Sequence, residues 1–219
     1  MTDVPSPPPE EGTVEVTETA GVPAPATASG YPVMVSADHA PEYARFMPLI
    51  KWLLLIPHYI ALFFLGIGAF FVWIASFFVV LFTAKYPEGM WNYMFGVQRW
   101  ALRVISYSLL ISDTYPPFTL EATPEDPVHL HAVRPETVSR WRPFFAWLIV
   151  IPYAIVASLI VYVAYICSFL AFFTIIFTKK IPEGLFNVIR IGLNWQYRAN
   201  FYSYYMSTEY PPFEWDDES

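Results

Sequence analysis

Two long apolar stretches of the chain repeat each other at a fixed spacing of 95 residues. Residues 45–118 align with residues 140–213 without a gap, and about one residue in three is identical. RFMPLIKWLLLIP matches RWRPFFAWLIVIP, FTAKYPEGMWN matches FTKKIPEGLFN, and SDTYPPF matches STEYPPF. Because proline, glycine and charged residues match in register, the pattern indicates duplication of one structural unit rather than shared hydrophobicity.

The composition points to lipid as the solvent for most of the chain. Hydrophobic residues make up 56% and charged residues 14%, far from the soluble norm. Residues 1–44 contain seven Asp or Glu and no Lys or Arg, whereas the repeats hold five basic against two acidic residues and six against two. Basic side chains beside apolar segments contact anionic head groups. We therefore expect a protein of the cell (cytoplasmic) membrane that binds lipid head groups and no nucleic acid.

The sequence divides into a disordered acidic tail, a first membrane repeat, a linker, a second membrane repeat and a second acidic tail, which cover residues 1–30, 31–121, 122–126, 127–215 and 216–219. The first tail is rich in Pro, Thr and Ala and cannot bury enough apolar surface to offset the entropy of ordering it. Alternating apolar residues open each repeat, Val33 with Val35 and Val128 with Leu130, which predicts a brief strand outside the lipid.

An apolar run follows each strand, over residues 48–83 and 143–178. A straight helix of about 35 residues would measure about 52 Å, more than the roughly 30 Å of a hydrocarbon core. Pro57 and Pro152 interrupt the two runs near their starts. We therefore expect a short interfacial helix before each proline and a tilted spanning helix after it.

The second helix of each repeat, residues 89–111 and 184–206, is long enough to cross a membrane but carries a polar stripe. At 100° per residue, one face holds Glu88, Asn92, Arg99 and Arg103 in the first repeat, and Glu183, Asn187, Arg190, Asn194 and Arg198 in the second. The stripes could line a polar cleft for a lipid head group or anion. Alternatively, each helix lies in the interface with its arginines among the head groups. The two glutamates are expected to cap the helix starts.

The expected topology has both helices of each repeat crossing the membrane, so that the repeats lie in parallel orientation. Five basic residues then share one face against three on the other, and the positive-inside rule predicts that both termini are cytoplasmic. A rival topology folds the long apolar run into a hairpin with its turn at Gly66 and Gly68. Val161 and Val163 occupy the equivalent positions, so the second repeat lacks a breaker there.

Several polar residues have simple structural interpretations. We expect His58 to be a histidine at the membrane interface. A proton relay shared by both repeats is not expected, because Tyr153 replaces His58 in the second repeat. His129 and His131 share one side of a predicted strand, and two histidines without further ligands do not make a metal site. Cys167 lies in an apolar run and is expected to pack there. The sequence lacks nucleophile, paired-acid and phosphate-loop motifs, so we expect no enzyme activity, no cofactor and no metal.

The strings PLIKWLLLIPHYI, FTAKYPEG, RW-x-LR and YPPF resemble a bacterial integral-membrane family, domain of unknown function 4389, with this chain as a tandem two-unit member. The resemblance covers residues 31–215 and implies no activity, substrate or cofactor. The second repeat departs from the motif at Ala146, Tyr153 and Asn194, so any role of Lys51, His58 or Arg99 would be confined to the first repeat.

These features predict an all-α membrane protein of two tandem repeats. Each repeat should contain a long kinked transmembrane helix, a second amphipathic or transmembrane helix and short extramembrane strands. We expect a non-catalytic scaffold or accessory subunit of a membrane complex, with an unidentified membrane-protein partner. One alternative binds or transports a lipid or small solute through a polar cleft between the repeats. The other is a membrane-shaping hairpin protein.

Overall fold

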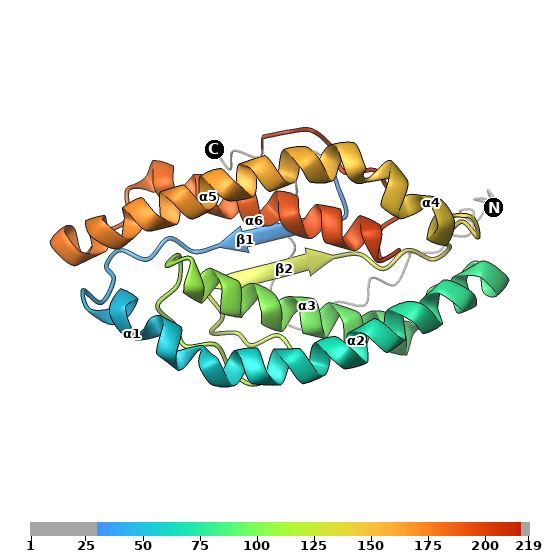
Figure 1. Ribbon diagram of the computed structural model, residues 1–219, viewed down its shortest axis with the longest axis horizontal. Helices are drawn as coiled ribbons and strands as arrows, with labels where there is room; N and C mark the ends of the chain where they lie inside the picture. The colour runs from blue at the N-terminus through green and yellow to red at the C-terminus, as the bar shows by residue number, and fades with distance from the viewer. Residues whose placement is uncertain (1–29, 216–219) are drawn as a thin grey trace, which may run out of the picture.

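The computed structural model describes residues 30–215 (Figure 1). Its elements follow in the order β1 (Val33–Ala37), α1 (Met47–Leu54), α2 (Ile56–Thr83), α3 (Glu88–Ser108), β2 (Val128–Ala132), α4 (Arg142–Ile149), α5 (Ile151–Thr178) and α6 (Glu183–Ser203). The mostly helical chain, its two tandem units and its small sheet agree with the sequence prediction. Apart from Gly30, the two expected acidic tails lie outside the described residues.

Each apolar run forms a short helix followed by a long one, as predicted. α1 gives way to α2 at Leu55, and α4 gives way to α5 at Val150. A proline lies in the first turn of all four helices, where its missing N–H costs no helical hydrogen bond. α2 continues through Gly66 and Gly68, so the predicted alternative of a hairpin turning there is wrong.

The second helix of each repeat is slightly shorter than predicted. α3 and α6 end at Ser108 and Ser203, three residues before the expected ends. Neither helix start has a side-chain cap, so Glu88 and Glu183 lie in the first turn without the predicted capping hydrogen bond. Their charges still lie near the positive end of the helix dipole.

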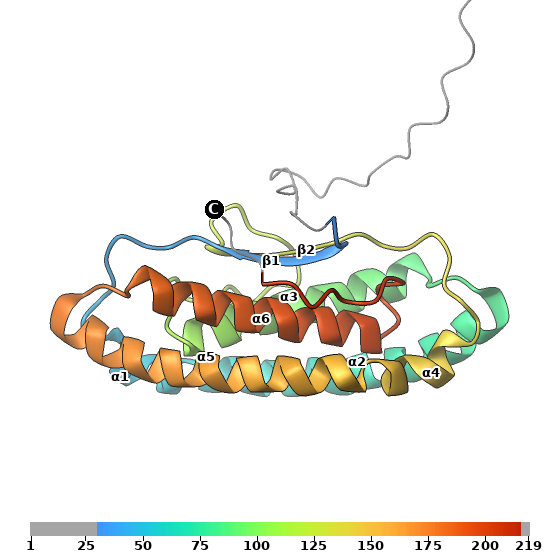
Figure 2. The same ribbon diagram turned by 90° about the horizontal axis from the view of Figure 1, so that it is seen from above.

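The elements form three layers (Figure 2). The sheet is one outer layer, α3 and α6 form the middle layer, and α1, α2, α4 and α5 form the other outer layer. Strands and long helices run roughly along the long axis of the molecule (Figure 1). The sheet therefore lies alongside the helices and not across their ends.

The two repeats lie antiparallel, with α2 and α5 running in opposite directions (Figure 1). The Tyr43 N–H donates to the Lys179 carbonyl over 2.8 Å, and the equivalent Val138 N–H donates to the Ala84 carbonyl over 2.8 Å. The start of each repeat therefore touches the turn between the two main helices of the other. The expectation of parallel repeats is wrong, because these contacts join opposite ends of the two units.

Each repeat also gives its strand to the other repeat. β1 and β2 pair antiparallel with Val33 opposite Ala132. Residues 118–121, which follow the prolines of the first YPPF motif and could extend as a strand by their sequence, form none. β1 packs against α6 of the second repeat, and β2 packs against α3 of the first. The Val35 N–H, for example, donates to Asn194 Oδ1 over 3.1 Å. One apolar core runs through both repeats, which are therefore interlocked.

Candidate functional site

The outer helical layer exposes a continuous set of large apolar side chains. Residues 47–83 contain one charged residue, Lys51, and residues 151–178 contain none. The exposed side chains include Trp52, Phe63, Phe64, Phe71, Phe82, Tyr162, Ile166, Phe169 and Phe177. Monomeric soluble proteins rarely expose apolar surface on this scale, which is typical of membrane or protein contact. We call this layer of α1, α2, α4 and α5 the apolar face.

The arginines of the first polar stripe bind backbone next to the sheet. Arg103 donates to the Thr119 carbonyl over 2.9 Å and to the Glu121 carbonyl, and its guanidinium lies 2.6 Å from the Asp126 carboxylate. Arg99 donates to the Leu120 carbonyl over 3.2 Å. Arg103 and Asp126 are both buried. These arginines therefore hold the segment that leads from α3 into β2.

The second stripe holds β1 in the same way. Arg198 is fully buried, donates to the Val33 carbonyl over 3.2 Å and lies 5.2 Å from the centre of the Tyr31 ring. Asn194 accepts the Val35 N–H described above. Burial raises the pKa of Tyr31 to about 12, so its hydroxyl stays protonated near Ser207. Arg198 and Asn194 thus secure the strand that comes from the other repeat.

The remaining stripe residues differ widely in exposure. Arg190 is buried, Asn187 is half-buried, and Asn92 and Glu183 are exposed. Glu88 is exposed and pairs with Arg134 over 3.7 Å. The nine stripe residues thus do not line one cleft. Arg99 and Arg103 hold the segment before β2, Asn194 and Arg198 hold β1, and both helix-start glutamates are exposed.

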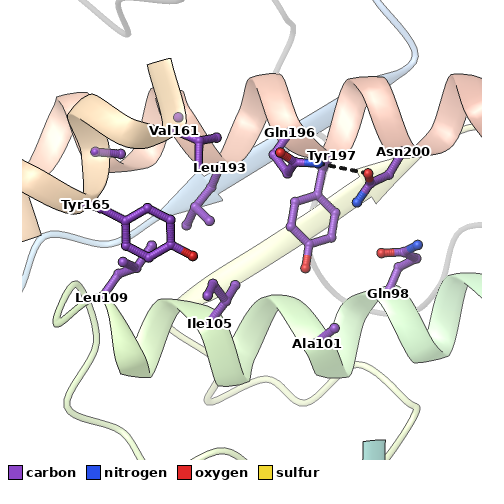
Figure 3. Close-up of a pocket in the computed structure, with 12 residues that line it drawn as sticks. Gln98, Ala101, Ile105, Leu109, Val161, Tyr165, Leu193, Gln196, Tyr197 and Asn200 are labelled. Carbon is purple, nitrogen blue, oxygen red and sulfur yellow. Dashed lines mark hydrogen bonds between the residues drawn. The ribbon is translucent and has the colours of Figure 1, made fainter. Parts of the chain in front are cut away.

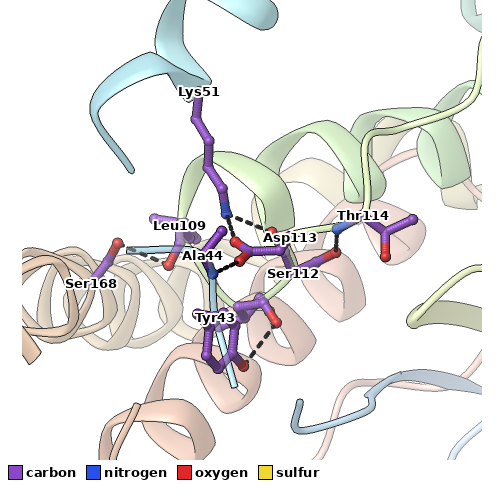
Figure 4. Close-up of polar contacts among 9 residues, drawn as sticks. Tyr43, Ala44, Lys51, Leu109, Ser112, Asp113, Thr114 and Ser168 are labelled. Carbon is purple, nitrogen blue, oxygen red and sulfur yellow. Dashed lines mark hydrogen bonds and ion pairs between the residues drawn. The ribbon is translucent and has the colours of Figure 1, made fainter. Parts of the chain in front are cut away.

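Lys51 forms the most buried charge contact of the apolar layer, with 2% of its side chain exposed. Its Nζ lies 2.7 Å from the Asp113 carboxylate, donates to the Ser112 carbonyl over 2.6 Å and lies 4.4 Å from the centre of the Tyr107 ring. Asp113 also accepts the Ala44 N–H over 2.7 Å (Figure 4). This cluster fixes α1 to the end of α3. Sequence analysis missed it, although a lysine within an apolar run needs a partner.

The second repeat places a cation on the equivalent tyrosine from a different position, without an acidic partner among residues 30–215, because Thr208 stands in the place of Asp113. Ala146 stands in the place of Lys51, and Arg142, one helical turn earlier, supplies the cation. Arg142 donates to the Thr208 carbonyl over 2.8 Å and lies 4.1 Å from the centre of the Tyr202 ring. The departure of the second repeat from the motif at Ala146 is therefore compensated within the same helix.

His58 is fully buried within the protein. Its Nδ1 accepts the Trp100 indole N–H over 3.1 Å, and its ring stacks on Phe118 with centroids 4.0 Å apart. In the second repeat Tyr153 stacks on Trp195 with centroids 4.8 Å apart. The position therefore holds a flat ring that joins the long helix, the second helix and the YPPF segment.

The two strand histidines lie on the sheet. His131 Nε2 lies 3.3 Å from Ser36 Oγ, and its ring centroid lies 6.1 Å from that of His129. Burial lowers the pKa of His131, with further lowering from His129 and Arg99. Among residues 30–215 no group of three or more metal-ligating side chains comes together. Cys167 is buried on α5, where it packs in the apolar core.

A cavity of about 270 Å³ lies between the two repeats (Figure 3). It is formed by facing sides of α3 and α6 and by one side of α5, and its lining residues are Gln98, Ala101, Ile105, Leu109, Val161, Ala164, Tyr165, Gly192, Leu193, Gln196, Tyr197 and Asn200. None of the nine predicted stripe residues lines this cavity. On both α3 and α6, the side that lines the cavity is therefore different from the side that carries the polar stripe.

Comparison with known families found one match. The family model described as Domain of unknown function (DUF4389) matches residues 48–119 and again residues 140–214. No curated protein and no solved structure matches the chain. The two matched regions coincide with the two antiparallel units and cover the apolar face, the stripes and both cation clusters.

Proposed function

The chain belongs to the family Domain of unknown function (DUF4389), and we propose from its geometry that it is an in-plane membrane protein. In this arrangement the apolar face enters one leaflet, with α2 and α5 parallel to the membrane surface. α3 and α6 lie nearer the head groups, and the sheet faces water. Amphipathic helices bind membranes in this way through buried apolar area.

The path of the chain between the repeats carries the proposal. The first repeat ends beside α1, where the Ser112 carbonyl accepts the hydrogen bond from Lys51. The second repeat begins at the far end of α2, where Val138 binds Ala84. Residues 112–138 therefore run the length of α2, about 42 Å, and contain a strand but no helix. If α2 crossed the bilayer this segment would also cross it, and unpaired backbone groups are not tolerated in hydrocarbon.

Exposure of the long helices supports lipid contact. Among residues 30–215, two segments are long and apolar enough to span a membrane, residues 47–83 and 151–178. In their most apolar parts 11% and 22% of the residues are buried, whereas a core helix of a soluble protein is mostly buried. An in-plane position satisfies this apolar surface without moving the sheet into the bilayer. Basic residues at the helix ends then face one aqueous side, which the positive-inside rule predicts to be the cytoplasm. In this arrangement both termini are on the cytoplasmic side as well.

We propose a non-catalytic scaffold or accessory role at this membrane surface. The ion pairs that the fold brings together, Lys51 with Asp113 and Arg103 with Asp126, hold segments of the chain itself. The sheet layer would then offer a partner membrane protein a rigid platform. A second candidate, a membrane-shaping protein, is favoured by the single apolar layer, because insertion into one leaflet expands that leaflet alone.

Labelling of single cysteines tests the in-plane arrangement. In a Cys167→Ala background, Arg45→Cys and Lys85→Cys mark the exposed ends of the α1–α2 run. Arg140→Cys and Lys180→Cys are the matched pair in the second repeat. A membrane-impermeant maleimide should reach all four from the same side of sealed membrane vesicles. Labelling of Arg45→Cys and Lys85→Cys from opposite sides would show that α2 crosses the membrane.

Copurification separates the two candidate roles. The tagged full chain, gently solubilised from native membranes, should recover one membrane protein in a fixed ratio if it is a scaffold. Recovery of lipid without a protein partner would contradict the scaffold role. Remodelling of spherical vesicles into tubules by the purified chain would then support the membrane-shaping role.

A further inference from the structure

The cavity between α3 and α6 has chemically distinct ends (Figure 3). One end holds the carboxamides of Gln98, Gln196 and Asn200, and Gln196 donates to Asn200 over 3.0 Å. The other end is lined by Ile105, Leu109 and Leu193. The Tyr197 hydroxyl points across the cavity toward α3 (Figure 3).

The cavity opens toward the apolar face and away from the sheet. Val161 and Tyr165 on α5 form part of its wall, and about half of the Tyr165 side chain is exposed. No residue of β1 or β2 lines it. Its open side therefore lies beside α5, where Tyr165 is exposed, and α5 belongs to the outer helical layer opposite the sheet (Figure 2). If the apolar face enters a leaflet, the molecules that reach this open side are lipids.

We propose that this cavity holds one glycerolipid of the surrounding leaflet, an inference that rests on the proposed in-plane arrangement. The ester carbonyls of the lipid accept hydrogen bonds from the carboxamides, and the first part of one acyl chain lies against the apolar end. No Lys, Arg, Asp or Glu lines the cavity, so its walls suit the uncharged ester region and not the phosphate. The head group remains outside, at the level of the membrane surface.

The size of the cavity suits the first part of an acyl chain. At roughly 30 Å³ per water-sized group, 270 Å³ has room for about nine such groups in a row or cluster. Gly192 lets α6 pack closely against α5 at the edge of the cavity, because a Cβ on Gly192 would lie 2.7 Å from the Ala164 Cβ.

Photocrosslinking with two lipid probes tests the proposal. The full chain is bound to vesicles of phosphatidylethanolamine and phosphatidylglycerol that contain a phosphatidylcholine with a diazirine either next to the ester or at the end of one acyl chain. The first probe should label peptides around Gln98 and Asn200. The second should label peptides around Leu109 and Leu193. Flotation of the same sample reports membrane binding independently.

Two variants and one control identify the site. Ala101→Phe fills the cavity and should reduce labelling of α3 and α6 to background while α2 and α5 stay labelled. The double variant Gln98→Leu and Asn200→Leu removes ester contacts without adding bulk, and it should abolish labelling by the first probe in particular. Val163→Phe, on the exposed side of α5, should leave both patterns unchanged.

Three outcomes would overturn the inference. One is a floating chain whose α3 and α6 peptides are never labelled. Another is equal labelling of these peptides in Ala101→Phe and the native chain. The third is loss of labelling at these peptides, with α2 and α5 still labelled, when native membranes that contain the same probes replace the vesicles, which would assign the cavity to a partner helix. A chain that does not float contradicts the in-plane arrangement itself, so the two failures are distinguishable.

Discussion

Lys51 on α1 and Arg142 on α4 come from different turns of equivalent helices, yet each brings its cation to the equivalent tyrosine ring of its repeat and to one of two adjacent backbone carbonyls, Ser112 in the first repeat and Thr208, one position further on, in the second. Lys51 Nζ lies 4.4 Å from the Tyr107 ring centre, and the Arg142 guanidinium lies 4.1 Å from the Tyr202 ring centre. Residues four apart on a helix share a face, so the longer arginine can reach the same point from one turn away. The cation is thus a requirement of the fold, while its position in the sequence is not.

Moving the charge within α1 should therefore restore stability. Lys51→Ala leaves Asp113 without its partner, and we expect a loss of about 3–5 kcal/mol in the free energy of unfolding. Adding Met47→Arg recreates the arrangement of the second repeat and should recover much of the loss. Denaturant unfolding in detergent micelles measures both changes. A double variant no more stable than Lys51→Ala would show that the two clusters are not equivalent.

Arg103 should be a structural residue and not a ligand contact. Arg103→Leu leaves the buried Asp126 carboxylate unpaired and two carbonyls without a donor, so we expect a loss of about 3–5 kcal/mol. Arg103→Lys keeps the charge but not the planar fork, and should lose less. Arg45→Leu, at an exposed position, should stay within about 0.5 kcal/mol. A native unfolding midpoint for Arg103→Leu would contradict this role.

The sequence predicted the local structure of each repeat well because local rules determine it. Pro57 and Pro152 marked the break between the short and long helices, and the PEG motifs marked the starts of α3 and α6. The lengths of the helices could be predicted because each helix is one continuous stretch of the sequence with its own apolar pattern. The strands near Val33 and Val128 were also predicted, but their antiparallel pairing with each other was not.

The relation between the repeats could not be predicted in the same way. Parallel and antiparallel repeats bury similar helix faces, and the choice depends on contacts such as Tyr43 with Lys179, far apart in the sequence. Arg103 and Arg198 bind backbone carbonyls, which leave no mark on residue type, and the Asp126 partner of Arg103 lies 23 residues away in the sequence. The polar stripes were therefore recognised, but the segments that they bind were not.

The exchanged strands predict that the two halves of the chain assemble when expressed separately. Residues 1–124 and 125–219, divided in an exposed part of the linker, should copurify through a tag on either one. Each strand is buried against the other half, so neither half alone should give a monodisperse monomer. Asn194→Leu removes the acceptor for Val35 and should weaken recovery. Two independently folded, non-associating halves would show that the exchange is dispensable.

His131 should make the fold less stable in mild acid. Its pKa is lowered in the folded chain by burial, His129 and Arg99, so below about pH 6.5 the unfolded state takes up a proton that the folded state does not. The contribution is therefore fully present above that pH and is lost as the pH falls toward the lowered pKa. The free energy of unfolding in detergent, measured from about pH 7.5 to 5.5, should fall less in His131→Gln than in the native chain. His129→Gln, which keeps the Ser36 contact of His131, is the control and should retain a pH-dependent loss. Parallel pH profiles for His131→Gln and the native chain would show that another group titrates.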